Sequence, residues 1–244
     1  MNFYSVIIGT ELLNGRRKDA HFSFLNKQLL NRGWTHKASF VIEDDTNLMK
    51  NIFKLIKEDP NSVMFCFGGI GATPDDYTRD IAAEVFTDSK MQYHEKAKEL
   101  IINQFGQEAY PHRIEMSHLP INAKLLKNVV NNVAGFYLKD RFFFTPGFPS
   151  MSQSMIVEAL DKLYFKNNIK KYRNTLIAQC PENELISIMK LIPTNIELSS
   201  LPRINGETKK VEISLSSESK ELINKYFQLF IDYLINKEIN YKIK

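Results

Sequence analysis

Two short, unbroken apolar runs stand out in the first third of the chain, and each is followed by a glycine. They cover residues 3–8 and 63–67. Strands that are buried on both faces of a parallel sheet have this continuous apolar character. We therefore expect both runs to be central strands, with a ligand site at their glycine ends.

Helical and strand patterns alternate between these two runs. One helical stripe comprises Phe22, Leu25, Leu29 and Leu30, and a second comprises Leu48, Ile52, Leu55 and Ile56. Residues 39–42 between the stripes predict a strand. With right-handed crossovers, this βαβαβ order predicts a three-layer, doubly wound α/β domain with a mostly parallel sheet.

The remaining pattern predicts a second, smaller domain. Helices are expected over 77–85 and 95–105, an irregular segment over 106–120, strands over 124–130, 135–138 and 141–144, and a closing helix up to 164. The polar stretch 165–171 has no periodicity and predicts a boundary. We expect an α/β domain at 1–164 and an α+β domain at 170–244. The latter has strands at 174–179, 196–201 and 211–215, helices at 182–191 and from 222 to 234, and a frayed tail.

The segment after the second apolar run carries the most information about function. It contains Gly68, Gly69, Gly71, Thr73, Pro74, Asp75 and Asp76. Glycines permit positive φ and let backbone amides approach an anion. Thr73 as N-cap and Pro74 at the first helical position would place both acids in the first turn of a helix. Capping does not explain three glycines and a second acid, which favour a ligand or metal site.

Three further loops leave strands at the same edge of the sheet. The first offers Gly9, Glu11 and Gly15, with Arg16 or Arg17 as a bidentate phosphate donor. The second offers Asp44 and Asp45, either of which could cap the next helix. The third offers Pro146 and Gly147, with Ser150 as a helix cap. Because hard divalent cations prefer oxygen ligands, Asp44 and Asp76 together could hold Mg²⁺ or a similar ion.

Composition and missing motifs narrow the function classes. The chain has 43% hydrophobic and 25% charged residues, no GxSxG, P-loop or complete GxGxxG, and five histidines without ligand spacing. Cys66 and Cys180 lack metal or disulfide spacing and are expected to be buried thiols. Residues 165–244 carry 13 Lys/Arg against 9 Asp/Glu, and the rest carries 19 of each. This bias is too weak to predict nucleic-acid binding. Without a basic leader or an apolar run long enough to span a bilayer, we expect a cytoplasmic protein that does not enter membranes.

The motifs at 8–15, 68–78 and 146–149 together resemble the molybdopterin-binding superfamily that includes MoaB, MogA and gephyrin. The resemblance covers about residues 3–163 and is closest to the N-terminal part of CinA, the competence/damage-inducible protein; the segment after 170 is similar to the small domain that follows there. It implies a molybdopterin or nucleotide ligand and a homo-oligomer. It also implies one of two activities, molybdopterin adenylylation or divalent-metal-dependent hydrolysis of ADP-ribose, with Asp44 and Asp76 as catalytic and metal-binding residues.

The chain departs from the pattern of the resemblance at three places. His21 stands where CinA-like sequences have Asn, residues 131–135 replace a Gly-Thr-Ala-Pro-Gly turn, and Met151 replaces an acid. Asn131 and Asn132 tolerate left-handed backbone, so the turn is expected to survive. A non-catalytic pterin- or nucleotide-binding regulatory protein therefore stays open as an alternative.

Overall fold

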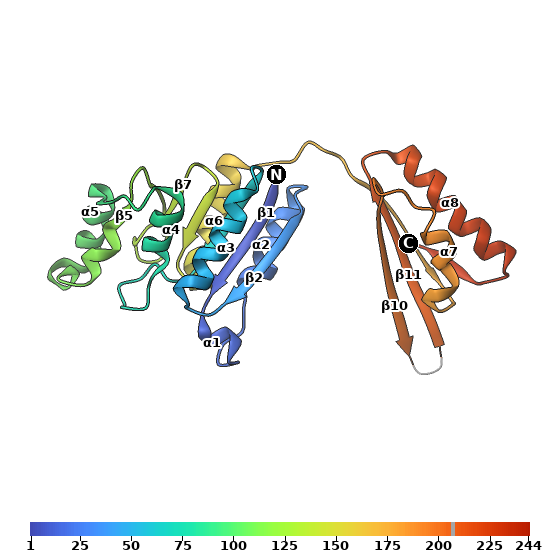
Figure 1. Cartoon of the computed structure of the whole chain (residues 1–244), viewed down its shortest axis with the longest axis horizontal. Helices are drawn as coiled ribbons and strands as arrows, with labels where there is room; N and C mark the ends of the chain where they lie inside the picture. Colours follow the sequence, from blue (N-terminus) through green and yellow to red (C-terminus); the bar gives the residue numbers. More distant parts are fainter. Residues whose placement is uncertain (206–207) are drawn as a thin grey trace. The chain divides into compact units, whose positions relative to one another are not determined.

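The structure is a computed structural model that describes residues 1–205 and 208–244. The chain divides into two compact units, Met1–Asn167 and Asn168–Lys244. Figure 1 labels the elements of both units along the chain. None of the described helices is long and apolar enough to cross a membrane.

The first unit contains a six-stranded, mostly parallel sheet, as the sequence predicts. Its strand order is β2-β1-β3-β8-β7-β6. The bounds are β1 Asn2–Ile8, β2 His36–Ile42, β3 Ser62–Phe67, β6 Lys124–Leu126, β7 Gly135–Leu138 and β8 Phe142–Thr145. The four strands β2, β1, β3 and β8 run parallel, and β7 and β6 are antiparallel to their neighbours.

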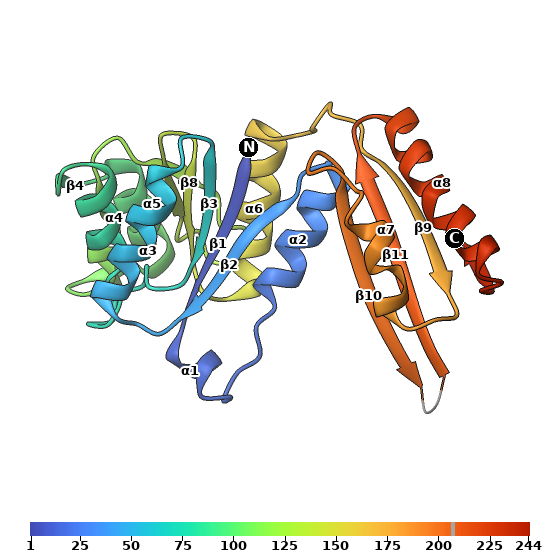
Figure 2. The same ribbon diagram turned by 45° about the vertical axis from the view of Figure 1, so that its right-hand side comes forward.

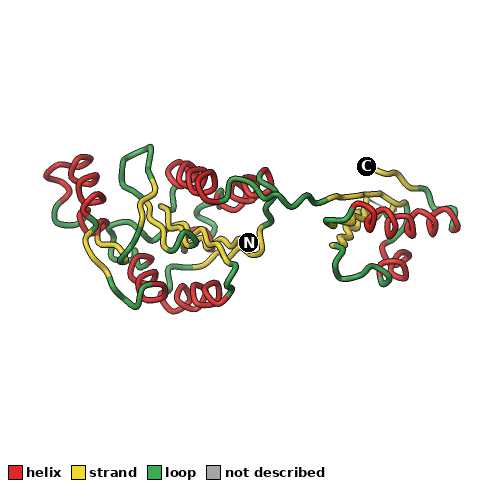
Figure 3. The backbone as a smooth tube through the Cα atoms, turned by 90° about the horizontal axis from the view of Figure 1, so that it is seen from above, coloured by secondary structure: helices red, strands yellow, loops and turns green. Residues whose placement is uncertain are grey.

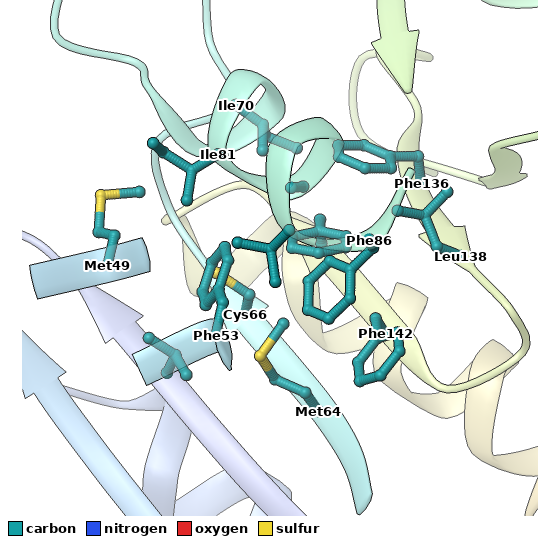
Figure 4. Close-up of a cluster of buried hydrophobic side chains, with 14 of the residues drawn as sticks. Met49, Phe53, Met64, Cys66, Ile70, Ile81, Phe86, Phe136, Leu138 and Phe142 are labelled. Carbon is teal, nitrogen blue, oxygen red and sulfur yellow. The ribbon is translucent and has the colours of Figure 1, made fainter. Parts of the chain in front are cut away.

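Helices cover both faces of this sheet and complete three layers (Figures 2 and 3). α3 (Thr46–Glu58) and α4 (Thr78–Phe86) pack over one face, and α2 (His21–Asn31) and α6 (Pro149–Leu163) over the other. Figure 4 shows the first of these cores, in which Cys66 lies beside Phe53 and the Phe86 ring stacks on the Phe142 ring. Cys66 is fully buried and Cys180 is also buried, and both are free thiols, as predicted.

The buried face of α3 differs from the predicted stripe. Met49, Ile52, Phe53 and Ile56 are the buried residues. Leu55, which was expected in the core, is 55% exposed. Both stripes satisfy helical spacing, and the structure selects the one that places the larger Phe53 ring against the sheet.

A small two-stranded element is inserted between α4 and β6. It consists of β4 (Met91–Tyr93), α5 (Glu95–Phe105), the 3-10 helices η1 (Gly106–Ala109) and η2 (Arg113–Ser117), and β5 (His118–Pro120), which pairs with β4. The helix over 95–105 is confirmed, whereas the expected irregular segment contains η1, η2 and β5. The predicted strand over 124–130 is too long, because the chain turns after Leu126.

The second unit is a four-stranded antiparallel sheet in the order β10-β11-β9-β12. Its elements are β9 Tyr172–Ala178, η3 Glu182–Leu185, α7 Ile186–Met189, β10 Glu197–Asn205, β11 Thr208–Ser217, α8 Lys220–Asn236 and β12 Tyr241–Ile243. The predicted helix over 182–191 is thus split into η3 and α7. The apolar stripe of α8 lies in the core, as expected. The prediction of a frayed tail is wrong, since β12 pairs with β9.

Candidate functional site

A cavity of about 530 Å³ lies where β1, β2, β3 and β8 end. These four strands are neighbours in the sheet, so the loops that follow them meet at one edge. Most site residues predicted from sequence line the cavity, whereas Gly15 and Arg16 do not. The lining residues among them are Gly9, Glu11, Asp44, Gly68, Gly69, Gly71, Thr73, Asp75, Asp76, Pro146 and Gly147. Gly15 instead lies in an exposed turn outside this lining.

The glycine segment forms a closed loop, not the capped helix start that the sequence suggests. α4 begins only at Thr78. Thr73 donates from its backbone N–H and its hydroxyl to Oδ2 of Asp76, over 2.8 and 2.6 Å. Thr78 donates its N–H to the Gly69 carbonyl over 2.9 Å. Because the loop folds back on itself in this way, Thr73 is not the helix cap and the two acids are not in the helix.

Close contacts inside the loop explain two of the glycines. A Cβ at Gly69 would lie 2.2 Å from the Thr78 hydroxyl, and φ there is +68°. A Cβ at Gly71 would lie 2.6 Å from Oδ2 of Asp76. A Cβ at either position would displace a side chain whose hydrogen bond holds the loop closed, so packing favours glycine at both positions. This structural reason stands beside the anion-binding one proposed from the sequence.

Arg79 is a site residue that the sequence reasoning missed. Its Nη1 donates to the carbonyls of Ile70 and Gly71 and so fastens the loop from beneath. Burial lowers the pKa of Arg79, although the charges of nearby Asp76, Asp80 and Glu115 oppose this. A cation in the first turn of a helix faces the positive end of the macrodipole. That unfavourable placement is the signal that could have revealed a specific role.

Asp44 is held in the same manner as Asp76 but by a different loop. The N–H and the hydroxyl of Thr10 both donate to Oδ2 of Asp44 over 2.9 Å. Asp45, not Asp44, caps α3, since it accepts from the Leu48 N–H at 2.6 Å. The structure thereby assigns the two acids separate tasks, and Asp44 is the one that lines the cavity.

Asp44 and Asp76 each keep one carboxylate oxygen available. Within residues 1–205 and 208–244, Oδ1 of either side chain accepts no hydrogen bond. The same residues contain no group of three or more His, Cys, Asp or Glu that could hold a metal. A divalent cation such as Mg²⁺ often takes only one or two carboxylates, with water and phosphate oxygens as its other ligands. The two free oxygens fit that donor set.

Arg17, and not Arg16, lines the cavity. Its Nη2 donates to the Gly147 carbonyl at 2.8 Å, and its Nη1 lies 3.5 Å from Oε1 of Glu11. The guanidinium also lies over the Phe148 ring, 5.3 Å from the centroid. Arg17 therefore connects the loop after β1 to the loop after β8.

The far wall of the cavity is formed by amide and apolar side chains. Buried Asn128 donates to Oδ1 of Asn131 at 2.6 Å, and Asn132 has φ +59°, so the expected left-handed turn is present. Nδ2 of Asn131 contacts the sulfur of Met151 at 3.9 Å. Phe105 and Met116 of the insert complete this wall and were also missed, because nothing local links them to strand ends.

The helix start beside this wall also differs from expectation. Phe148 is the N-cap residue of α6, with Pro149 at the first helical position. Ser150 lies inside the helix and is not the cap. The backbone after Gly147 thus enters the helix without a side-chain cap, and Phe148 remains at the cavity mouth.

Comparisons with known proteins identify the family to which the chain belongs. Residues 5–164 match the family described as "Probable molybdopterin binding domain". A protein of Caldivirga maquilingensis is 24% identical over 97% of this chain and 96% of its own length. A "CinA-like protein" of Sulfurihydrogenibium sp. is 26% identical over 78% of this chain, which corresponds to 50% of its own length.

The fold has a solved counterpart. The structure of CinA from Thermoplasma acidophilum matches 66% of this chain and 98% of its own, with a TM-score of 0.59 and 24% identity. The residues matched by the family, 5–164, lie in the unit that carries the cavity. The chain therefore belongs to the probable molybdopterin-binding domain family, and its first unit is a CinA-like member of that family.

Proposed function

We propose that the first unit binds a nucleotide or pterin that carries a diphosphate and, with a divalent cation, hydrolyses the bond between the two phosphates. The observation that carries the proposal is that Asp44 and Asp76 line one cavity with the glycine loop, each with an Oδ1 that accepts no hydrogen bond from the described residues. In hydrolysis, water adds across the P–O–P bridge and leaves two monophosphates. ADP-ribose is the substrate that we propose, because the resemblance of the sequence motifs to CinA implies it.

The charge of the cavity supports the need for a cation. Its lining includes four carboxylates, from Glu11, Asp44, Asp75 and Asp76, and one guanidinium, from Arg17. Oppositely charged Glu11 lies 3.5 Å from that guanidinium. A diphosphate entering alone would meet a surplus of negative charge. When bound, a divalent cation would neutralise charge on the phosphate oxygens.

The apolar far wall supports a ligand with a flat ring. Phe105, Met116, Val133 and Met151 are apolar residues among those that line the cavity. Aromatic and thioether groups pack well against planar heterocycles. In the proposal this wall holds the adenine or pterin ring, and the amide of Asn131 offers the ring a hydrogen-bonding partner.

Hydrolysis of ADP-ribose with and without Mg²⁺ or Mn²⁺ tests the proposal. We expect metal-dependent release of AMP and ribose 5-phosphate by the parent, and a loss of at least about tenfold in Asp76→Asn, because one cation ligand is weakened. Asp80→Asn is the matched control: it makes the same charge change on α4, outside the cavity lining. Equal turnover by the parent and Asp76→Asn would remove the role of Asp76.

A binding protein without catalysis is the second candidate. It is favoured by the Asn131–Met151 contact, which occupies a part of the wall where CinA-like sequences carry an acid. Calorimetry that shows metal-dependent binding of ADP-ribose, together with no product after prolonged incubation, would select this candidate over the hydrolase.

A further inference from the structure

A second concavity adjoins the cavity on the other side of the glycine loop. This groove has a volume of about 600 Å³, similar to that of the cavity. Its lining residues are Ala72, Thr73, Pro74, Glu108, Tyr110, His112 and Arg113. Ala72 and Thr73 line both the cavity and the groove, so the two concavities share one wall.

The groove contains side chains that can contact a ligand. Tyr110 is 54% exposed, which leaves its ring available. Arg113 uses Nη1 to donate to the carbonyl and to Oε2 of Glu108, over 3.0 and 2.9 Å. Within the described part of the chain, its Nε and Nη2 make no hydrogen bond, so part of the guanidinium can still donate.

Arg113 also links the groove to the cavity. Its guanidinium lies over the Phe105 ring, 4.5 Å from the centroid, and Phe105 lines the cavity. The Phe105 ring therefore contacts a cation of the groove and at the same time forms part of the apolar wall of the cavity. The charge differs between the two concavities: the groove has one carboxylate beside Arg113 and His112, whereas the cavity has a surplus of carboxylates.

We propose that this groove is a subsite for the second half of a two-ended, diphosphate-bridged ligand whose ring-bearing half lies in the cavity. The proposal rests on the function proposed above. The diphosphate crosses the shared wall at Ala72 and Thr73, beside Asp76, and the distal sugar lies against Tyr110 within reach of Arg113. A mononucleotide would fill the cavity and leave the groove empty.

Continuity and size favour this occupant. The two volumes each lie within the range typical of small-molecule sites, and the wall that the two concavities share at Ala72 and Thr73 lets one ligand extend into both. The hydroxyl groups of a sugar suit this groove, because its guanidinium still has N–H groups that can donate hydrogen bonds and its aromatic ring can pack against the sugar. The insert that carries α5, η1 and η2 thereby determines how long a ligand the site accepts.

Calorimetric titration of the full chain with ADP-ribose, supplied as its non-hydrolysable α,β-methylene analogue so that no turnover occurs, and with AMP, both in the presence of Mg²⁺, tests the proposal. We expect the parent to bind ADP-ribose at least about tenfold more tightly than AMP, and Tyr110→Ala to lose roughly tenfold for ADP-ribose only, because the lost ring contact lies beyond the first phosphate. Arg113→Gln should act in the same direction. Tyr93→Ala is the control: it removes a similarly exposed ring of the insert, 47% against 54% for Tyr110, that lines neither concavity.

The outcomes separate this proposal from the one on which it rests. If the parent binds neither ligand, the proposed function fails. If the parent binds both with equal affinity, or if Tyr110→Ala weakens AMP by the same factor as ADP-ribose, the groove is not a subsite for the distal half. A loss in Tyr93→Ala as large as that in Tyr110→Ala would likewise overturn the assignment, since it would show a general disturbance of the insert.

Discussion

The two ends of the central sheet carry aspartates in different states of hydrogen bonding. At the amino ends of the strands, Asp59 accepts from Asn2, Tyr4 and Lys37 at Oδ2, over 2.7, 2.8 and 3.1 Å, and from the Asn61 N–H at Oδ1, over 3.0 Å. At the carboxyl ends, Asp44 and Asp76 each use only Oδ2 within the described residues. A saturated carboxylate stabilises the fold, whereas a half-used one is available to a ligand.

Two arginines, one at each end of the sheet, differ in what their hydrogen bonds hold together. Arg141, at the amino ends, donates to the carbonyls of Asp59 and Ser62 and to the Ser62 hydroxyl. Arg141 thereby joins β3 to the segment that precedes this strand. Arg79, at the carboxyl ends, fastens two carbonyls of a single loop that lines the cavity. Similar donors thus stabilise the sheet at one end and shape a site at the other.

The largest expected effect is a loss of stability in Gly69→Ala, which tests whether packing in the glycine loop requires glycine at this position. Gly69→Ala places a methyl group 2.2 Å from the buried Thr78 hydroxyl at φ +68°. We expect a loss of at least about 3 kcal/mol in the free energy of unfolding, measured by urea denaturation. Gly15→Ala is the matched control, because φ is +79° but the new Cβ would meet nothing within 4 Å. It should cost about 1 kcal/mol. Equal losses would show that backbone strain alone, and not packing in the loop, demands glycine at 69.

A smaller loss of stability is expected when Asp59, at the amino ends of the strands, is replaced. Burial raises the pKa of Asp59, but hydrogen bonds from Asn2, Tyr4 and Lys37 outweigh it and hold the pKa well below its ordinary value. Because the folded pKa lies below the unfolded one, the stabilisation is complete above about pH 4 and is lost as the pH falls toward the folded pKa. Asp59→Asn should lower the free energy of unfolding at pH 7 by about 2 kcal/mol and flatten its decline below pH 4.

Asp44→Asn supplies the counterpart at the carboxyl ends. An amide oxygen can still accept from Thr10, so we expect a stability change within about 0.5 kcal/mol, together with weaker metal-dependent binding of ADP-ribose. Urea denaturation from pH 3 to 8 measures both variants. If Asp44→Asn destabilises the fold as much as Asp59→Asn does, the functional distinction between the two ends is wrong.

The sequence predicted the layers of the first unit because continuous apolar strands and helical stripes carry that information directly. It could not fix which of two stripes on α3 is buried, since Leu55 and Phe53 both satisfy the period. It also predicted that Asp44 and Asp76 would lie at one edge, because parallel strands end together. Phe105 and Arg113 escaped prediction, as their contacts with the site depend on how the insert folds back.

Local rules misjudged the start of α4 for a related reason. Thr73 and Pro74 are good residues for a helix start, and propensity alone places the helix there. The bonds between Thr73 and Asp76 and between Thr78 and Gly69 compete with that start and close a loop instead. The failure of the local rule marks the cavity wall, as expected where a site overrides local preference.

The smallest expected effect concerns Arg16 and Arg17, either of which the sequence offers as a phosphate donor. Arg17 already donates to Gly147 and lies beside Glu11, so little of its guanidinium is free for a phosphate. We expect Arg17→Ala to weaken metal-dependent ADP-ribose binding about three- to fivefold, through loosening of the contact between the two loops. Arg16→Ala is the control, since Arg16 bonds only to Asn14 among the described residues and lies outside the cavity lining; its affinity should match the parent in the same calorimetric titration. A loss of a hundredfold or more in Arg17→Ala would show that Arg17 binds phosphate directly. In that case the carboxyl ends would supply a cationic donor of their own, and a divalent cation held by Asp44 and Asp76 would no longer be enough to account for how this edge of the sheet binds a phosphate.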